Sequence, residues 1–494
     1  MSSSEGNPLP STGVVGRLTL NQYNSLKSFW KEFFKLIDQA PEKGTWKPGD
    51  QQQQQQQQGE EEIEPEIDHK INHEPILNNE SKAQSQPLDE KLRSEQELND
   101  AKLALEKYGK VKFLETFWGM IMMDDPDVIV LKFLRARKWN VSAGVAMMAS
   151  CMKWRIEFGV DKTLEKGEEG LKDCEGFINQ MKMGKSFIQG TDKLGRPIVY
   201  ITVRLHKSSD TTTKSLEQYI IYVMESVRLM LIPPIIEKTT IVIDMTGFGL
   251  ANMDWKSLAF ILKCLESYYP ESLNVLLVHN APWIFQGVWK IISPMLDPVV
   301  RSKIRMTKTA EELKVHIDER HLVNHLGGTN DWTWSYEPVQ PSENEKMSDL
   351  IGKARELNQR KHLANVHMDI TRQWCEDIKT DQASVISEHE KENEIMAPDM
   401  SEKALLRTLA MYHLRAQYFV LDPYIRGRSV YHRRGNVVGN GLITFQYPRV
   451  RDESGEEIDE WEVSGYQMSR ESLLILIQNL KSTLDKRKIS YPNL

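Results

Sequence analysis

The spacing of hydrophobic residues along the 494-residue chain changes several times and divides it into segments. Within 14–40, apolar side chains recur every three to four positions and predict an amphipathic helix. Residues 41–90 lack this period, contain the glutamine tract 51–58, and are expected to be a disordered insertion. The helical period returns at 91–160. The chain therefore begins with helices separated by a polar insertion.

Between 165 and 330 the pattern alternates between the periods of strands and helices. Short runs rich in β-branched residues predict strands at 197–204, 239–247, 273–282 and 303–309. Helical patterns lie between them at 214–231, 252–268 and 282–294. Strands that alternate with helices predict βαβ crossovers and an α/β domain with a mixed, mostly parallel sheet.

The remaining 331–494 form a C-terminal extension of unknown role. Helices are expected at 345–380 and 468–484, on either side of a basic, aromatic segment at 400–450. A cluster of arginines in the segment 400–450 contains Arg426, Arg428, Arg433 and Arg434. Three interpretations stay open: a solvated basic loop, a contact with anionic lipid head groups, or a surface for a protein partner.

One predicted helix, at 282–294 in NAPWIFQGVWKIISPMLDPVVRSK, is unusually apolar. Only Gln286, Lys290 and Ser293 interrupt it, and they lie on one narrow stripe. An ordinary surface helix has a much wider polar face. We therefore expect apolar contacts on more than one side of this helix.

Composition and charge restrict the possible partners and location. The net charge is −7, from 63 basic and 70 acidic residues, which argues against a nucleic-acid partner. The four cysteines lie far apart without a CxxC pair, which favours a reducing compartment. The N-terminus does not resemble a secretory signal. No run approaches the roughly 18 apolar residues that a spanning helix needs. We expect a cytoplasmic protein whose membrane contact is peripheral.

Motifs of catalysis, cofactor binding and metal binding are missing from the sequence. Gly247-Phe-Gly249 lacks the third glycine of a dinucleotide-binding turn, and no phosphate-binding loop or GxSxG motif occurs. His321 and His325 lack the glutamate of a zinc-hydrolase helix. We therefore expect no catalytic residues, cofactor or metal. An α/β oxidoreductase remains the weaker alternative.

Three charged residues lie where a ligand could use them. Arg137 is expected on the apolar face of the helix that begins at Asp125-Pro126, where a guanidinium needs an anion. That anion is either a structural carboxylate or a ligand. Glu271 precedes the third predicted strand and Lys303 the fourth. Each has an ordinary structural interpretation when taken alone.

Together, FLRARKWN, GRPIVYITV, YYPESLNVLLVHNAPWIF, LDPVVRSKI and HLGG occur in one order across 92–330. This order resembles the CRAL-TRIO lipid-binding family, and within it the fungal non-classical phosphatidylinositol transfer proteins. The resemblance implies a helical N-terminal tripod and a sheet domain whose apolar lipid pocket is closed by a gate helix. The gate residues would be Trp283, Ile284, Phe285, Val288, Trp289 and Ile292.

The resemblance also implies a head-group site and a transfer function. The phosphoinositol-binding positions correspond to Arg137, Glu271, Val300 and Lys303, with Val300 in place of a threonine. Positions that bind phosphatidylcholine in the family are here Ile188, Val199, Gly249 and Ala251, so little phosphatidylcholine binding is expected. The implied function is exchange or sensing of one phospholipid, phosphatidylinositol, with transient contact to endoplasmic reticulum, endosome or lipid droplet. Squalene, a sterol or haem are alternative ligands.

Overall fold

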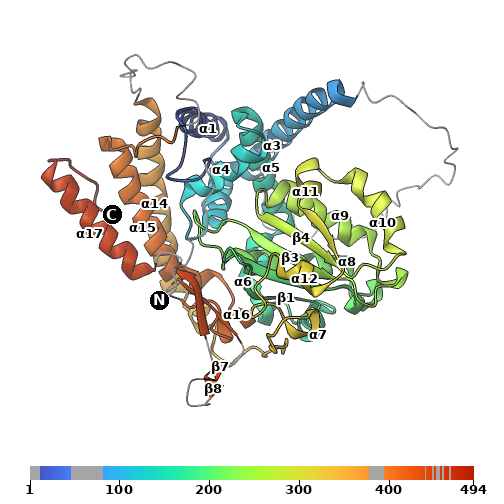
Figure 1. Ribbon diagram of the computed structural model, residues 1–494. Coiled ribbons are helices and arrows are strands. Elements are labelled where there is room, and N and C mark those ends of the chain that lie inside the picture. The colour runs from blue at the N-terminus through green and yellow to red at the C-terminus, as the bar shows by residue number, and fades with distance from the viewer. Residues whose placement is uncertain are drawn as a thin grey trace.

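The chain folds into a helical part, a sheet domain and a mainly helical C-terminal part (Figure 1). The computed structural model describes residues 12–45, 82–377, 394–439, 441–447, 450–451, 457–458, 461–466 and 469–494. Most of the predicted insertion 41–90, including its glutamine tract, lies outside the described residues.

Within residues 12–45 and 82–158, the helical N-terminal part contains four helices. They are α1 (Leu20–Asp38), α3 (Lys82–Ile121), α4 (Pro126–Ala136) and α5 (Val141–Phe158). Thr19 and Gln22 form a capping box that begins α1. Asp125 caps α4, whose first residue is proline. Both helix starts follow from the local sequence.

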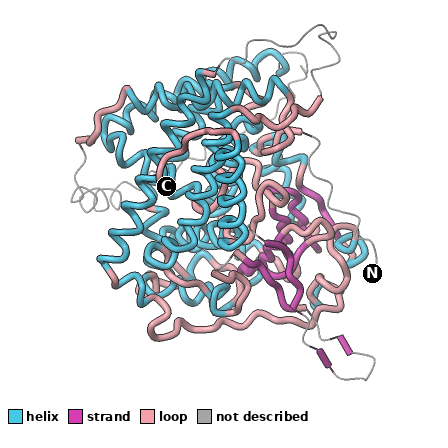
Figure 2. Tube along the Cα trace, turned by 90° about the vertical axis from the view of Figure 1, so that its left-hand side faces the viewer, coloured by secondary structure: helices cyan, strands magenta, loops and turns pink. Residues whose placement is uncertain are grey.

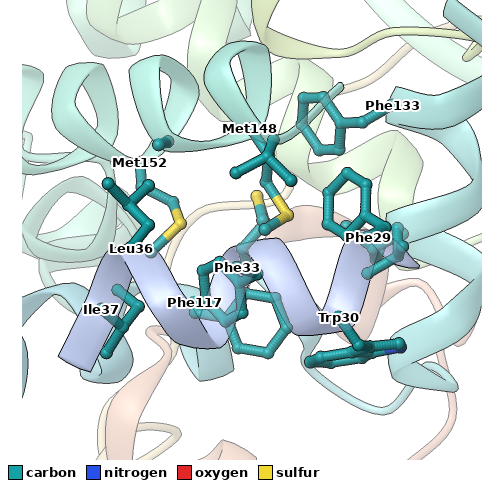
Figure 3. Close-up of a cluster of buried hydrophobic side chains, with 14 of the residues drawn as sticks. Phe29, Trp30, Phe33, Leu36, Ile37, Phe117, Phe133, Met148 and Met152 are labelled. Atoms are coloured by element: carbon teal, nitrogen blue, oxygen red, sulfur yellow. The ribbon is translucent and has the colours of Figure 1, made fainter. Parts of the chain in front are cut away.

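The core of this part surrounds the apolar face of α1. Phe29, Trp30 and Phe33 are fully buried. Figure 3 shows them facing Phe117 and Met148 from neighbouring helices. The isolated N-terminal helix therefore belongs to the same hydrophobic core as the helices beyond the insertion.

The sheet domain contains a five-stranded mixed sheet with strand order β1-β2-β3-β4-β5. The strands are β1 (Ser186–Thr191), β2 (Pro197–Thr202), β3 (Thr239–Asp244), β4 (Leu273–His279) and β5 (Ile304–Thr307). β1 runs antiparallel to β2, and the other neighbours are parallel. The predicted fold class is confirmed, although the sequence interpretation missed β1.

Seven helices accompany the sheet, several of them very short. They are α6 (Val160–Gly170), α7 (Phe177–Met183), α8 (Thr213–Arg228), α9 (Trp255–Lys263), α10 (Phe285–Ile292), α11 (Pro298–Ser302) and α12 (Ala310–Lys314). Alternate residues of each strand face opposite sides of the sheet. Val199 and Ile241 pack on the side of α8, whereas Ile198 and Val242 pack with Leu313 of α12. The sheet is therefore buried on both faces.

The C-terminal extension packs against the rest of the protein. Its helices are α13 (Glu345–Ser348), α14 (Leu350–Glu376), α15 (Glu402–Ile425), α16 (Val430–Arg433) and α17 (Arg470–Lys486). Two strand pairs join β6 (Leu442–Gln446) with β9 (Trp461–Tyr466), and β7 (Val450–Arg451) with β8 (Glu457–Ile458). Figure 1 shows α14, α15 and α17 side by side at the left, away from the five-stranded sheet at the right; Figure 2 shows the same molecule turned by 90°.

The arginine cluster of the extension corrects two expectations. Arg426 is only 6% exposed and its Nε donates to Asp422. Arg433 forms ion pairs with Glu168 and Glu343. Arg428 pairs with Asp422, and Arg434 with Glu337. The solvated loop and the lipid-facing patch are therefore both wrong, because these cations face carboxylates of the chain itself.

Candidate functional site

An apolar cavity of about 300 Å³ lies against one face of the sheet. Its wall on the sheet is formed by Val199, Ile201, Ile241, Ile243, Leu276, Val278 and Ile304. These residues alternate with those that face α12, so strand periodicity builds the apolar wall. α8 and α9 supply much of the opposite wall, including Ile220, Val223 and Ile261. Such a space suits hydrocarbon better than water.

The predicted gate helix closes part of this cavity. Phe285, Trp289 and Ile292 line it from α10, at the spacing of one helix face. The ring of Phe285 meets that of Phe248 edge to face, with centroids 5.9 Å apart. Trp283, in the turn before α10, is 82% exposed. Two other predicted gate residues, Ile284 and Val288, pack into the apolar cluster around the cavity. The helix α10 thus contacts the cavity, and the turn before it presents a tryptophan to the outside.

A cluster of charges lies where three parallel strands begin. Lys238, Glu271 and Lys303 precede β3, β4 and β5, so parallel pairing brings them to one sheet edge. Glu271 Oε2 lies 3.3 Å from Lys238 Nζ, and Oε1 lies 3.9 Å from Lys303 Nζ. The adjoining residues Ser272 and Ile304 line the cavity. We call these three residues the entry-edge cluster.

The entry-edge cluster carries a net positive charge. Burial opposes ionisation of Glu271, but the ammonium groups of Lys303 and Lys238 outweigh it and lower its pKa. Burial lowers the pKa of Lys303, and Glu271 partly offsets that effect. Two lysines therefore share one carboxylate. Glu271 also has a φ of +55°, an uncommon conformation for a non-glycine residue, and such conformations concentrate at functional sites.

Lys238 was missed by the sequence interpretation, although a signal existed. It precedes β3 just as Lys303 precedes β5. Charged residues at equivalent ends of parallel strands meet at one edge. Comparing strand starts would therefore have found it.

The structure does not place Arg137 in the entry-edge cluster. Its Nη2 donates to both carboxylate oxygens of Glu97, at 2.7 and 2.9 Å. Arg137 follows the last residue of α4 with non-helical φ and ψ, so helical face periodicity does not extend to it. Arg135 instead pairs with Glu237, and its charge contributes to the lowered pKa of Glu271. The sequence left open whether Arg137 contacts a structural carboxylate or a ligand. In this structure it contacts a structural carboxylate, that of Glu97.

The other predicted site residues differ in whether they line the cavity. Val199 lines it. Ile188 is buried in the same apolar cluster but is not part of the lining, and Val300 of α11 is likewise buried there. Gly249 and Ala251 belong to a turn in which Asn252 reaches the cavity. No hydroxyl stands at any of these predicted positions.

Metal-binding groups and membrane spans were searched over the described ranges. No group of three or more His, Cys, Asp or Glu residues there could hold a metal ion. None of the helices described has both the length and the apolar character needed to cross a bilayer.

Fold and site together define an α/β protein with an apolar cavity between a mixed sheet and a closing helix. Family models agree with this class: the CRAL/TRIO domain matches residues 181–328, and the CRAL/TRIO N-terminal domain matches 91–150. A CRAL-TRIO domain-containing protein of Schizosaccharomyces pombe is 39% identical over 321 residues, which cover 65% of this chain and 67% of that protein. The chain therefore belongs to the CRAL-TRIO family, and the predicted resemblance is confirmed.

A second relative carries a functional name. Phosphatidylinositol transfer protein CSR1 of Eremothecium gossypii is 35% identical over 325 residues, 65% of this chain and 70% of that protein. Among solved structures, the crystal structure of Sfh5 is similar with a TM-score of 0.33 and 17% identity. That similarity covers 49% of this chain and 85% of Sfh5.

Proposed function

We propose that this protein carries one membrane lipid at a time, with phosphatidylinositol as its principal ligand, and exchanges it between membranes or presents it as a sensor. The observation that carries the proposal is an apolar cavity whose sheet edge bears the net-positive entry-edge cluster. A relative named as a phosphatidylinositol transfer protein supports it. Binding and release of the lipid require no covalent chemistry.

In this proposal the cavity holds the acyl chains of the lipid, and the entry-edge cluster binds its head group. Each buried methylene of an acyl chain contributes about 0.8 kcal/mol, so a dry cavity can replace the bilayer interior as its environment. A phosphodiester is bound by cationic donors, here Lys303 and Lys238. Inositol hydroxyls donate to the Glu271 carboxylate. Arg137 joins the phosphate only when it releases Glu97.

Exchange requires the gate helix to move at a membrane surface. Trp283 is exposed, and tryptophan favours the membrane interface. The protein docks peripherally, α10 swings away from the cavity, and the acyl chains pass between protein and bilayer. We place it in the cytoplasm with transient contact to the endoplasmic reticulum, endosome or lipid droplet.

Transfer of radiolabelled phosphatidylinositol between vesicles tests the proposal. Lys303→Ala removes one cation of the cluster, and we expect transfer to fall at least about tenfold, the loss of one charge-assisted contact. Lys308→Ala is the matched control, because Lys308 is exposed just beyond the far end of the same strand. Equal transfer by both variants and the unmodified protein would refute the head-group site.

A neutral hydrophobic ligand is the second candidate. Val199 lines the cavity where phosphatidylcholine-binding members of the family carry a tyrosine, and most of the sheet residues that line the cavity are apolar. Mass spectrometry of the lipid extracted from purified protein separates the two. Phosphatidylinositol near one per chain favours the first candidate, and squalene or a sterol the second. Haem would add a Soret absorbance.

A further inference from the structure

A second polar group lines the same cavity at the opposite edge of the sheet. It consists of Lys185, Ser186, His206 and Asp254. β1 is antiparallel to β2, so Lys185 at the start of β1 lies beside the end of β2. The backbone N–H of Thr202 donates to its carbonyl at 2.9 Å. His206 and Asp254 follow β2 and β3 in the chain. We call this group the far-edge group.

The far-edge group and the entry-edge cluster lie at opposite ends of the strands. β2 and β3 each span six residues. At about 3.3 Å per residue, the two edges are about 16–20 Å apart. The two groups are therefore separate, and the apolar wall lies between them.

Lys185 is a buried cation that contacts an imidazole and, among the residues that the structure describes, forms no direct ion pair. It is 5% exposed, and its Nζ lies 3.1 Å from Nδ1 of His206. An ammonium only donates, so Nδ1 accepts and the proton of a neutral imidazole is on Nε2. Burial and the nearby Lys185 charge lower the pKa of His206, which keeps that ring neutral. Its Nε2 lies 3.4 Å from Oδ2 of Asp254. The imidazole thus positions the ammonium without neutralising it.

Lys185 and Ser186 both line the cavity, and the described residues leave part of their hydrogen-bonding capacity unused. Of the three N–H donors of Lys185, the contacts in the described part of the chain use one, toward His206. Ser186 is 8% exposed, and among the described residues its Oγ has no hydrogen-bond partner. Tyr219 fixes the backbone of Ser186, because its Oη accepts from the N–H at 3.1 Å and donates to the carbonyl at 3.0 Å. A buried cation and an unpaired hydroxyl both cost stability unless an anion joins them.

We propose that Lys185 and Ser186 form a second ligand subsite, which binds the anionic oxygens at the head of a single-chain lipid. The lipid's alkyl chain lies along the apolar wall. The chemistry is that of a fatty-acid carboxylate or of a lysophospholipid phosphate. The inference rests on the proposed function in one respect, that the cavity holds lipid. It adds a ligand class that the entry-edge cluster does not select.

The titratable groups near Lys185 give this subsite a pH dependence. Burial lowers the pKa of Lys185 to about 8, and Asp210 and Asp254 partly oppose that effect. His206 is the remaining titratable neighbour in contact. The ammonium is present below pH 8 and is lost above it. Binding of an anionic lipid therefore weakens as the pH rises through 8, whereas binding of a neutral analogue does not.

Binding of oleate, methyl oleate and oleoyl lysophosphatidate to the full chain tests the subsite. Displacement of a fluorescent alkyl probe at submicellar concentrations gives each affinity. We expect oleate to bind about 10- to 100-fold more tightly than its uncharged methyl ester. Lys185→Met should abolish this preference, and Lys185→Arg, which keeps the charge, should retain part of it. The matched control is Lys193→Met, because Lys193 is exposed in the turn before β2. Comparing the affinity for oleoyl lysophosphatidate with the affinity for oleate shows whether the subsite prefers a phosphate or a carboxylate.

Some outcomes would overturn the subsite while leaving the proposed function intact. They are equal binding of oleate and methyl oleate by the unmodified protein, or a preference that survives in Lys185→Met. If Lys185→Met does not fold, as judged by circular dichroism, the pH series on the unmodified protein decides: a constant oleate preference from pH 6.5 to 9.5 overturns the subsite. Failure of phosphatidylinositol transfer with an intact oleate preference would instead count against the proposed principal ligand alone.

Discussion

Arg407 of α15 and Asp127 of α4 form a buried ion pair through two hydrogen bonds of 2.6 Å, although 280 positions separate them in the sequence. The indole Nε1 of Trp30 in α1 donates to the same carboxylate at 2.8 Å. Thr371 of α14 accepts from Arg407 Nε at 2.9 Å. This network joins the N-terminal helix, the CRAL-TRIO helices and the C-terminal extension into one folded unit.

Replacing Arg407 by alanine should destabilise the whole protein. The change leaves the Asp127 carboxylate buried without its cation, which costs about 3–5 kcal/mol. Denaturant unfolding followed by tryptophan fluorescence measures the loss. The control is Arg372→Ala, whose partner Asp38 is 44% exposed, so the loss should stay below about 1 kcal/mol. Equal effects of the two changes would contradict the role of the buried network.

Glu225 should make folding stability depend on pH in the acid range. Burial raises its pKa, but Arg155 and Arg228 outweigh this effect and lower the pKa from 4.5 to about 2. Because the folded pKa is the lower one, this stabilisation is complete above pH 4.5 and is lost as the pH falls toward 2. The shift corresponds to about 3 kcal/mol.

Unfolding free energies from pH 6 to 2 test this dependence. Glu225→Gln should be less stable at pH 6 but should lose less stability on acidification than the unmodified protein. Glu311→Gln, an exposed carboxylate in α12, should follow the unmodified profile. Parallel profiles for Glu225→Gln and the unmodified protein would show that Glu225 titrates alike in the folded and unfolded states.

Val300→Thr should strengthen phosphatidylinositol binding if the proposed head-group site is right. A hydroxyl at this position would add one hydrogen bond of about 0.5–1.5 kcal/mol to the head group, up to about tenfold in affinity. Val300 is 9% exposed, so some loss of stability is expected as well. Val299→Thr controls for the substitution, because Val299 is 47% exposed. The same vesicle assay measures both, and an identical rate for both variants would count against a head group at Val300.

Substitutions of Trp283 and Trp289 should have different effects, because the first should weaken membrane docking and the second lipid binding in the cavity. Trp283→Ala removes an exposed ring, so the free energy of unfolding should change by no more than about 0.5 kcal/mol. The fraction of protein that sediments with vesicles should decrease. Trp289→Ala removes a ring that lines the cavity and should reduce the affinity for the acyl chains. If Trp283→Ala sediments with vesicles as the unmodified protein does, docking through this turn is wrong.

Much of the fold could be predicted because its signals are local. Alternating β-branched residues identify β2 to β5, and the apolar spacing at 283–294 identifies α10, which lines the cavity. β1 was missed because SFIQGT has neither a clear alternation nor a long β-branched run. Its place in the sheet depends on pairing with β2, which is a contact between segments.

The sequence by itself determined the family, strands β2 to β5 of the sheet and the helix over the cavity, since periodicity and motif order require only neighbouring residues. The tertiary structure decided which charge meets which. It pairs Arg137 with Glu97, pairs the arginine cluster of the extension with carboxylates, and places Lys238 beside Glu271. The physical reason is that a charge pairs with groups brought near it by packing, whatever their separation along the chain.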